Sequence, residues 1–76
     1  MKIQDLLQQK LDSLEINNYK LSKATGIPYS SLRDFLRPSD RVDLVKLGRV
    51  CGVIGVTPWA LFREYHNAKL NAIKEE

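Results

Sequence analysis

The chain has 76 residues, a formal net charge of +3, 43% hydrophobic residues and one cysteine. This length favours a single domain, and the apolar content excludes a disordered chain. One cysteine cannot form an internal disulfide, and no run approaches the ~18 apolar residues of a membrane span. Since polar residues also interrupt any candidate signal peptide, we expect a cytoplasmic protein without a membrane partner.

Apolar residues recur at helical spacing along the whole chain, and no segment alternates as a strand would. The first stripe consists of Ile3, Leu6, Leu7, Leu11 and Leu14. It predicts a helix near residues 2–14.

Four further helix starts share one arrangement, in which two apolar residues five positions apart flank a residue that can cap a helix. The cap positions are Asn17, Pro28, Asp43 and Thr57. Asn, Asp and Thr are favoured N-caps, and the apolar pair matches a hydrophobic staple. Pro28 is the poor cap because its side chain has no acceptor, and Asp40 is a rival start for the fourth helix. The predicted helices lie near 18–25, 29–36, 44–54 and 58–70 or beyond.

A sharp corner is predicted between the second and third helices. Gly26 falls where a helix ends, and glycine adopts the left-handed conformation there at little cost. Pro28 pushes Ile27 away from helical angles. The segment 26–28 is therefore predicted to be the turn of a helix–turn–helix.

The third predicted helix has an apolar back and a polar front. Leu32, Phe35 and Leu36 form the back, and Ser30, Arg33, Asp34 and Arg37 form the front, with Tyr29 at the seam. A helix fits the DNA major groove, and arginine can donate two bonds to guanine. An ordinary solvated helix face fits the same spacing, and Asp34 could simply tether an arginine.

Positive charge is concentrated in the middle of the chain. Residues 17–49 hold seven basic and three acidic residues, whereas the rest holds five basic and six acidic ones. This distribution fits a polyanionic partner for the central helices, and it fits equally a solvated surface whose charge is uneven.

The segment NYKLSKATGIPYSSLRDFLR, residues 18–37, resembles the helix–turn–helix of the Cro/phage-repressor (XRE-like) family. Residues 47–54 and GVTPWALF, residues 55–62, are similar to the fourth and fifth helices of that family. The resemblance covers about residues 3–63. It implies an all-α fold: a compact five-helix, lambda-repressor-like domain spanning residues 1–76, with the helix–turn–helix at its second and third helices.

The resemblance also implies a function, namely a sequence-specific regulator of transcription that binds double-stranded DNA as a homodimer on a two-fold operator. A Cro-like repressor or an antitoxin, with a toxin or regulatory protein as partner, would fit so short a chain. The implied base-contacting residues are Tyr29, Ser30, Arg33, Asp34 and Arg37. The implied phosphate-contacting residues are Asn17, Asn18, Ser39 and Arg41, with Arg37 as an alternative to its base contact, and to these we add Lys20. The family often has Gln where this chain has Asn18 and Tyr29, so base preference cannot be transferred.

A protein–protein interaction module of the same fold without DNA binding is the alternative. The acidic residues near the arginines support it, because they weaken the local positive field. RNA binding is a weaker option, since Tyr29 alone is not a stacking platform.

No enzyme is expected, and neither is a metal or cofactor. Cys51 lies on the core stripe of the fourth helix, and His66 has no ligand partner at metal-binding spacing. No glycine-rich phosphate loop occurs.

The last two predicted helices carry three further expectations. Gly48 and Gly52 in a helix interior suggest close approach of another backbone, either from the same chain, which we favour, or from a partner subunit. Trp59 and Phe62 are expected to close the core. Leu70 and Ile73 are expected to form either a dimer contact or a frayed end.

Overall fold

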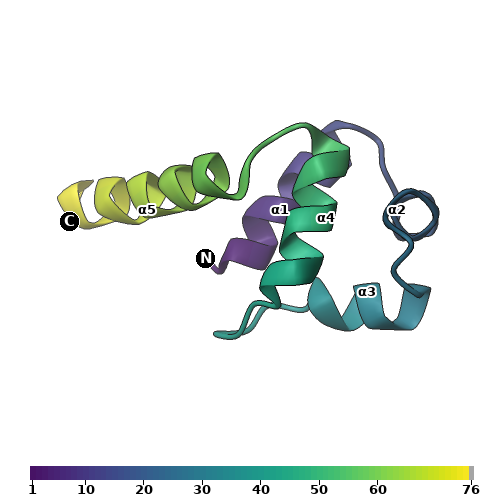
Figure 1. Cartoon of the computed structure of the whole chain (residues 1–76). Helices are drawn as coiled ribbons and strands as arrows, with labels where there is room; N and C mark the ends of the chain where they lie inside the picture. The colour runs from purple at the N-terminus through teal and green to yellow at the C-terminus, as the bar shows by residue number, and fades with distance from the viewer. Residues whose placement is uncertain (76) are drawn as a thin grey trace.

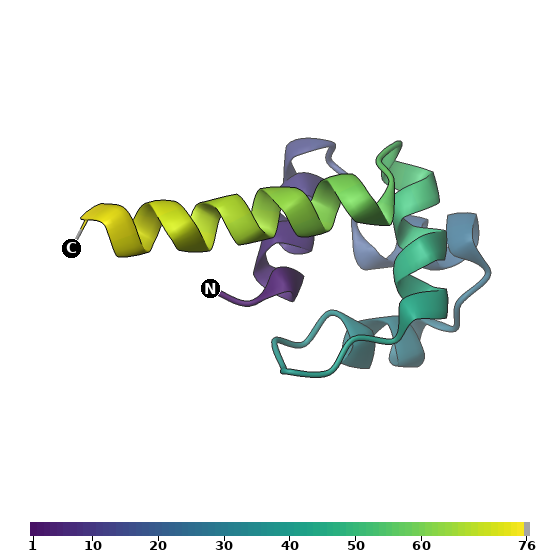
Figure 2. The same cartoon turned by 60° about the vertical axis from the view of Figure 1, so that its left-hand side comes forward.

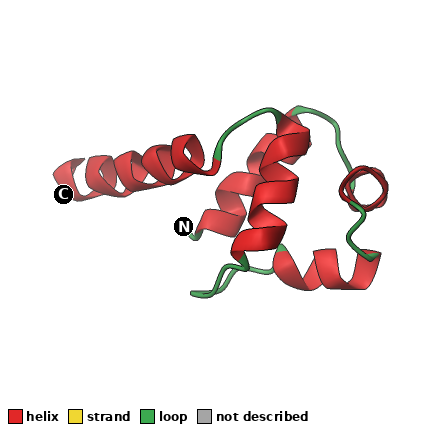
Figure 3. Ribbon diagram, in the orientation of Figure 1, coloured by secondary structure: helices red, strands yellow, loops and turns green. Residues whose placement is uncertain are grey.

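Five helices make up the protein, with no strand between residues 1 and 75 (Figure 3). The computed structural model describes the backbone of residues 1–75 and the side chains of residues 1–70. The helices are α1 (Ile3–Ser13), α2 (Asn18–Thr25), α3 (Tyr29–Phe35), α4 (Leu44–Ile54) and α5 (Pro58–Glu75). The all-α prediction is confirmed, and the first four helices agree with their predicted bounds to within one residue.

Three of the four predicted N-caps make side-chain hydrogen bonds. Asn17 Oδ1 accepts from the Lys20 N–H at 2.8 Å. Asp43 Oδ1 accepts from two backbone N–H groups at 3.0 and 3.1 Å, so Asp43, and not the rival Asp40, begins the fourth helix. Thr57 Oγ1 accepts from a backbone N–H at 3.1 Å, whereas Pro28 makes no such bond. The predicted pattern of helix starts therefore reflects real capping chemistry.

The corner between α2 and α3 is held by short-range hydrogen bonds. Gly26 adopts the left-handed conformation with φ 75°, as its position predicted. Ser22 Oγ donates to the Ile27 carbonyl at 2.6 Å, and the Ile27 N–H donates to Thr25 Oγ1 at 3.2 Å. These bonds satisfy backbone groups that the break in the helix would otherwise leave unpaired.

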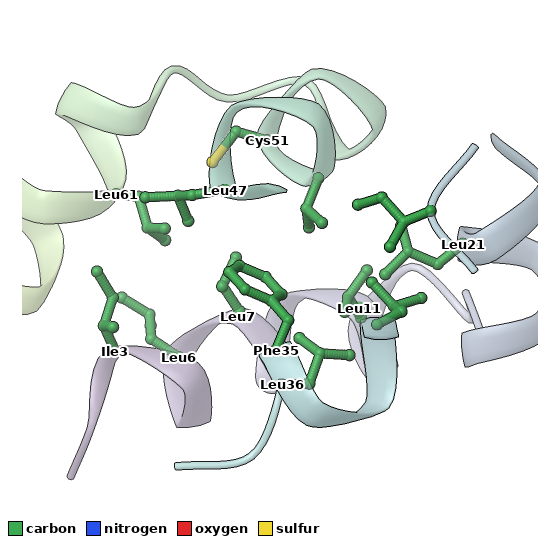
Figure 4. Packing of buried hydrophobic residues seen from close by; sticks show 13 residues of the cluster. Ile3, Leu6, Leu7, Leu11, Leu21, Phe35, Leu36, Leu47, Cys51 and Leu61 are labelled. Atoms are coloured by element: carbon green, nitrogen blue, oxygen red, sulfur yellow. The ribbon is translucent and has the colours of Figure 1, made fainter. Parts of the chain in front are cut away.

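One hydrophobic core joins all five helices (Figure 4). Its buried side chains are Ile3, Leu6, Leu7, Leu11, Leu21, Ile27, Leu32, Phe35, Leu36, Leu47, Val50, Cys51 and Leu61. Helix α4 packs between α2 and α5, and α1 packs against α5 (Figure 1). An ion pair joins α1 to α5, in which Lys10 Nζ lies 2.7 Å from Glu64 Oε2. The apolar stripes seen in the sequence are therefore the faces that pack together.

The prediction for Trp59 is wrong, because this side chain is 80% exposed. Helical residues turn by about 100° each, so Trp59 points away from the direction of Leu61, which is fully buried. Phe62 does pack against the core, half-buried, as predicted.

The favoured prediction for the α4 glycines is also wrong. Gly48 and Gly52 are exposed, and a Cβ built on either would meet no described atom within 4 Å. The rest of the chain packs instead on the opposite side of α4, which carries Leu47, Val50 and Cys51. The alternative, close approach of a partner subunit, stays a prediction.

Helix α5 continues past residue 70 to Glu75 and projects from the rest of the molecule (Figure 2). Leu70 on it is 40% exposed, and the side chain of Ile73 lies outside the described residues. Within the described range, no single helix is long and apolar enough to cross a bilayer; α4 and α5 qualify only as a pair bent by 95°.

Candidate nucleic-acid interface

Helix α3 divides its residues between the core and solvent as the sequence predicted. On its back, Leu32 is fully buried, and Phe35 and Leu36 are each 8% exposed. On its front, the side chains of all five predicted base-contacting residues are exposed: Tyr29, Ser30, Arg33, Asp34 and Arg37. The prediction that both arginines lie on one helix is wrong, because α3 ends at Phe35 and Arg37 lies in the turn after it. Helix α3 therefore presents the guanidinium group of Arg33, and the turn presents that of Arg37.

The two exposed arginines, Arg33 in α3 and Arg37 in the turn just after it, differ in their partners. Arg37 lies 3.5 Å from Asp34 in an ion pair whose side chains are both about 70% exposed. Such a surface pair is worth less than about 1 kcal/mol, so it does not immobilise Arg37. Arg33 makes no ion pair with any of the described side chains. Arg33 is thus the less restrained cation on this face.

The loop after α3 brings two predicted phosphate contacts beside that helix. Ser39 Oγ donates to the Arg41 carbonyl at 2.9 Å and accepts from the Arg41 N–H at 3.2 Å, which closes a tight turn. Ser39 and Arg41 line an open cleft of about 340 Å³ together with Ser31 and Asp34 of α3. The loop and the polar side of α3 therefore form one continuous surface.

The start of α2 places the remaining predicted residues in three different settings. Asn17 is exposed, but its Oδ1 is occupied by the cap, which leaves only its amide NH₂ for a ligand. Asn18 is half-buried, and Lys20 is exposed. Nearby, Lys23 Nζ lies 4.7 Å from the centre of the exposed Tyr19 ring.

Two residues near this surface were missed by the sequence analysis. Lys46 lines the cleft of Ser39 and Arg41, with its ammonium 3.8 Å from Asp43 Oδ2. The sequence places Lys46 in the first turn of α4, next to a loop rich in charged residues, and this position could have predicted its part in the surface. Gln4 is 1% exposed and donates to the Arg41 carbonyl at 3.1 Å. The sequence indicates a special role for Gln4 only through its polar side chain, which interrupts the apolar stripe of α1.

An ion pair joins the same loop to the beginning of α1. Lys2 Nζ bonds Asp40 Oδ1 on the molecular surface. The hydrogen bond and charge of Lys2 lower the pKa of the Asp40 carboxyl, and the same contact raises the pKa of Lys2. In the core, burial raises the pKa of the Cys51 thiol, so this cysteine is held in its unreactive protonated form.

The α3 surface is not obstructed by the last helix. Helix α5 packs on α1 and α4 and leaves on the side away from α3 in both views (Figures 1 and 2). Helix α5 therefore leaves the exposed side of α3 open to solvent.

Among the described residues, no three His, Cys, Asp or Glu side chains come together as a metal site would require. Comparisons with protein-family models, with curated proteins and with solved structures found no match to this chain.

Proposed function

We propose that the protein is a sequence-specific DNA-binding regulator of transcription, with α2 and α3 acting as a helix–turn–helix of the Cro/phage-repressor type. The observation that carries the proposal is the two-sided character of α3. Its back is buried in the core, and its front exposes Arg33, while the segment that follows it exposes Arg37, Ser39 and Arg41. An exposed helix face with an arginine, flanked by further basic and polar residues for the phosphates, suits recognition in the major groove.

In this proposal each element has its own role. Helix α3 enters the major groove, where Arg33 contacts a base edge and Arg37 either reads a base or contacts a phosphate. The start of α2, with Lys20, and the loop with Ser39 and Arg41 hold the sugar–phosphate backbone. Two copies of the chain would read half-sites about 34 Å apart on a two-fold operator. A toxin or another regulatory protein as partner fits the same proposal.

The alternative is a protein-interaction module with the same fold, and two observations favour it. Trp59 is 80% exposed, and Val45 and Leu44 are 69% and 68% exposed, which is unusual for large apolar side chains. The ion pairs of Asp34 and Asp43 also offset part of the positive charge around α3.

Titration of mixed-sequence duplex DNA at several salt concentrations tests the proposal and separates the roles of two arginines. Arg41→Ala should weaken binding to all sequences alike and reduce the slope of log K against log salt by about 1, because one phosphate contact is lost. Arg33→Ala should cost about 1–3 kcal/mol on a selected operator and relax the preference at one base position. Operator sequences would come from selection in a random DNA pool.

Arg63→Ala is the matched control, since Arg63 is an exposed arginine on α5 and lies away from the proposed interface. It should leave both affinity and salt slope unchanged. Absence of DNA binding by the unmodified protein at low salt would reject the proposal in favour of the interaction module. If Arg33→Ala and Arg41→Ala behaved alike, the assignment of base reader and phosphate contact would be wrong.

A further inference from the structure

Gln4 is the one polar side chain fully buried among residues 1–70. It lies in α1 between Ile3 and Leu6, which both belong to the core. An apolar residue at this position would continue the hydrophobic stripe of α1. The glutamine is therefore an exception to the pattern that builds the helix.

The amide of Gln4 is directed at the loop that follows α3. Gln4 Nε2 donates to the Arg41 carbonyl at 3.1 Å and lies 3.5 Å from Ser39 Oγ. These contacts span 37 and 35 residues of sequence. Through them, the first helix is connected to the turn that carries both predicted phosphate contacts of the loop.

Folding stability alone does not account for this glutamine. Gln4 Oε1 is buried without a hydrogen-bond partner among the described atoms, and a buried unpaired carbonyl is destabilising. The Arg41 carbonyl also accepts from Ser39 Oγ at 2.9 Å, so it would stay paired without Gln4. A leucine at position 4 would remove the unpaired oxygen and leave no new one.

The other link between α1 and this loop is weaker. The Lys2–Asp40 ion pair is exposed, with side-chain exposures of 47% and 87%, so water and salt compete with it. The hydrogen bond of Gln4 to the Arg41 carbonyl has a buried donor side chain and is therefore less open to water than the ion pair. It is the less exposed of the two polar contacts that join the turn of Ser39 and Arg41 to α1.

We propose that Gln4 is a positioning residue for DNA binding, which holds the turn of Ser39 and Arg41 in the conformation that contacts a phosphate. This inference rests on the function proposed above. A loop that is ordered before binding loses less conformational entropy when it meets its ligand, so the protein tolerates a less favourable core in exchange for a preorganised contact.

Gln4→Leu tests the inference, because it preserves burial and approximate volume while it removes the hydrogen bonds. We expect Tm to be unchanged or raised. We expect the affinity for mixed-sequence duplex DNA to fall by about tenfold. The reason is that Ser39, Arg41 and their turn would then lose conformational entropy on binding DNA. The salt slope should fall by about 1, as for Arg41→Ala. Amide hydrogen exchange at Arg41, whose N–H bonds Ser39, should become faster.

Gln8→Leu is the matched control on the same helix, since Gln8 bonds only Asp12, at 2.9 Å, and does not touch the loop. It should leave affinity, salt slope and Arg41 exchange unaltered. The double variant Gln4→Leu/Arg41→Ala should lose less affinity than the two single losses combined, because Gln4→Leu acts in part through the Arg41 contact.

The outcomes separate this inference from the proposed function. If the unmodified protein binds DNA and Gln4→Leu keeps its affinity and salt slope, the positioning role is refuted while the proposed function stands. The same conclusion follows if the effects of Gln4→Leu and Arg41→Ala simply add. If the unmodified protein does not bind DNA, the proposed function fails and the positioning role falls with it, whatever the hydrogen exchange of Arg41 shows.

Discussion

Glu15 lies two residues after the last residue of α1, Ser13, and has a left-handed backbone conformation. This conformation is unfavourable for any residue that has a Cβ atom. The φ of Glu15, 58°, lies in the left-handed region, and Glu15 is the one non-glycine residue with a positive φ in the described chain. The conformation is imposed by the helix end, where the Ile16 N–H donates to the Leu11 carbonyl at 2.9 Å. This bond belongs to the pattern in which glycine usually takes the left-handed position.

Replacement of Glu15 by glycine should stabilise the fold. The left-handed conformation costs a residue with a Cβ about 1–2 kcal/mol, and the greater freedom of glycine in the unfolded chain offsets part of the gain. We expect the free energy of unfolding to rise by about 1 kcal/mol and Tm by about 4–8 °C in calorimetry. Glu15→Ala keeps the Cβ and should give no such increase. An equal increase in both variants would assign the effect to the lost charge instead.

At the scale of the helices, α4 shows two unlike sides. One side is fully buried through Leu47, Val50 and Cys51, and the other exposes Val45, Gly48 and Gly52. Two glycines inside a helix weaken it, and no close packing by residues 1–70 compensates for them. The open side of α4 thus has no role in the isolated fold.

Gly48→Ala and Gly52→Ala should each stabilise the monomer by about 1 kcal/mol, because alanine favours the helix and its Cβ meets open space. Chemical denaturation at low protein concentration measures this change. Sedimentation at higher concentration then tests the predicted partner subunit. A loss of self-association in these variants would place another backbone against this side, whereas unchanged association would exclude it.

For the whole molecule, the beginning of the chain acts as a junction between the loop after α3 and the last helix. Lys2 bonds Asp40 of the loop, and the Tyr65 hydroxyl on α5 donates to the Met1 carbonyl at 3.1 Å. Gln4 adds the buried bond to Arg41. Parts of the chain that are distant in sequence are therefore held together around α1.

The Lys2–Asp40 pair predicts a specific pH dependence of stability. Since the pKa of Asp40 is lowered, its contribution is complete above the ordinary value of 3.8 and is lost as pH falls through the folded value. Since the pKa of Lys2 is raised, the same contribution is complete below 10.5 and is lost as pH rises through the folded value.

Asp40→Asn should accordingly be slightly less stable than the unmodified protein at neutral pH, with the two stabilities converging in strong acid and in strong base. Urea denaturation across the pH range checks this. The difference should be small and should shrink with added salt, because both side chains are exposed. A difference independent of pH would exclude the ion pair as its cause.

The positions and ends of the helices were determined by the sequence alone, because the forces that set them act within about five residues. Three helix starts are capped by side chains that accept from backbone N–H groups two or three residues later in the sequence, namely those of Asn17, Asp43 and Thr57. Gly26 ends α2 because glycine adopts the left-handed conformation at little cost. The exposed front of α3 was predictable for the same reason, since its helical period is a local property.

Only the tertiary structure decided what depends on how the helices cross. It placed Trp59 in solvent, left Gly48 and Gly52 without a neighbour, and joined Gln4 to Arg41. The sequence marks which side of a helix is apolar, but the partner of each position follows from packing angles that many residues set together. For this reason the exposed arginines could be predicted from the sequence, whereas the buried amide that positions their neighbouring loop could not.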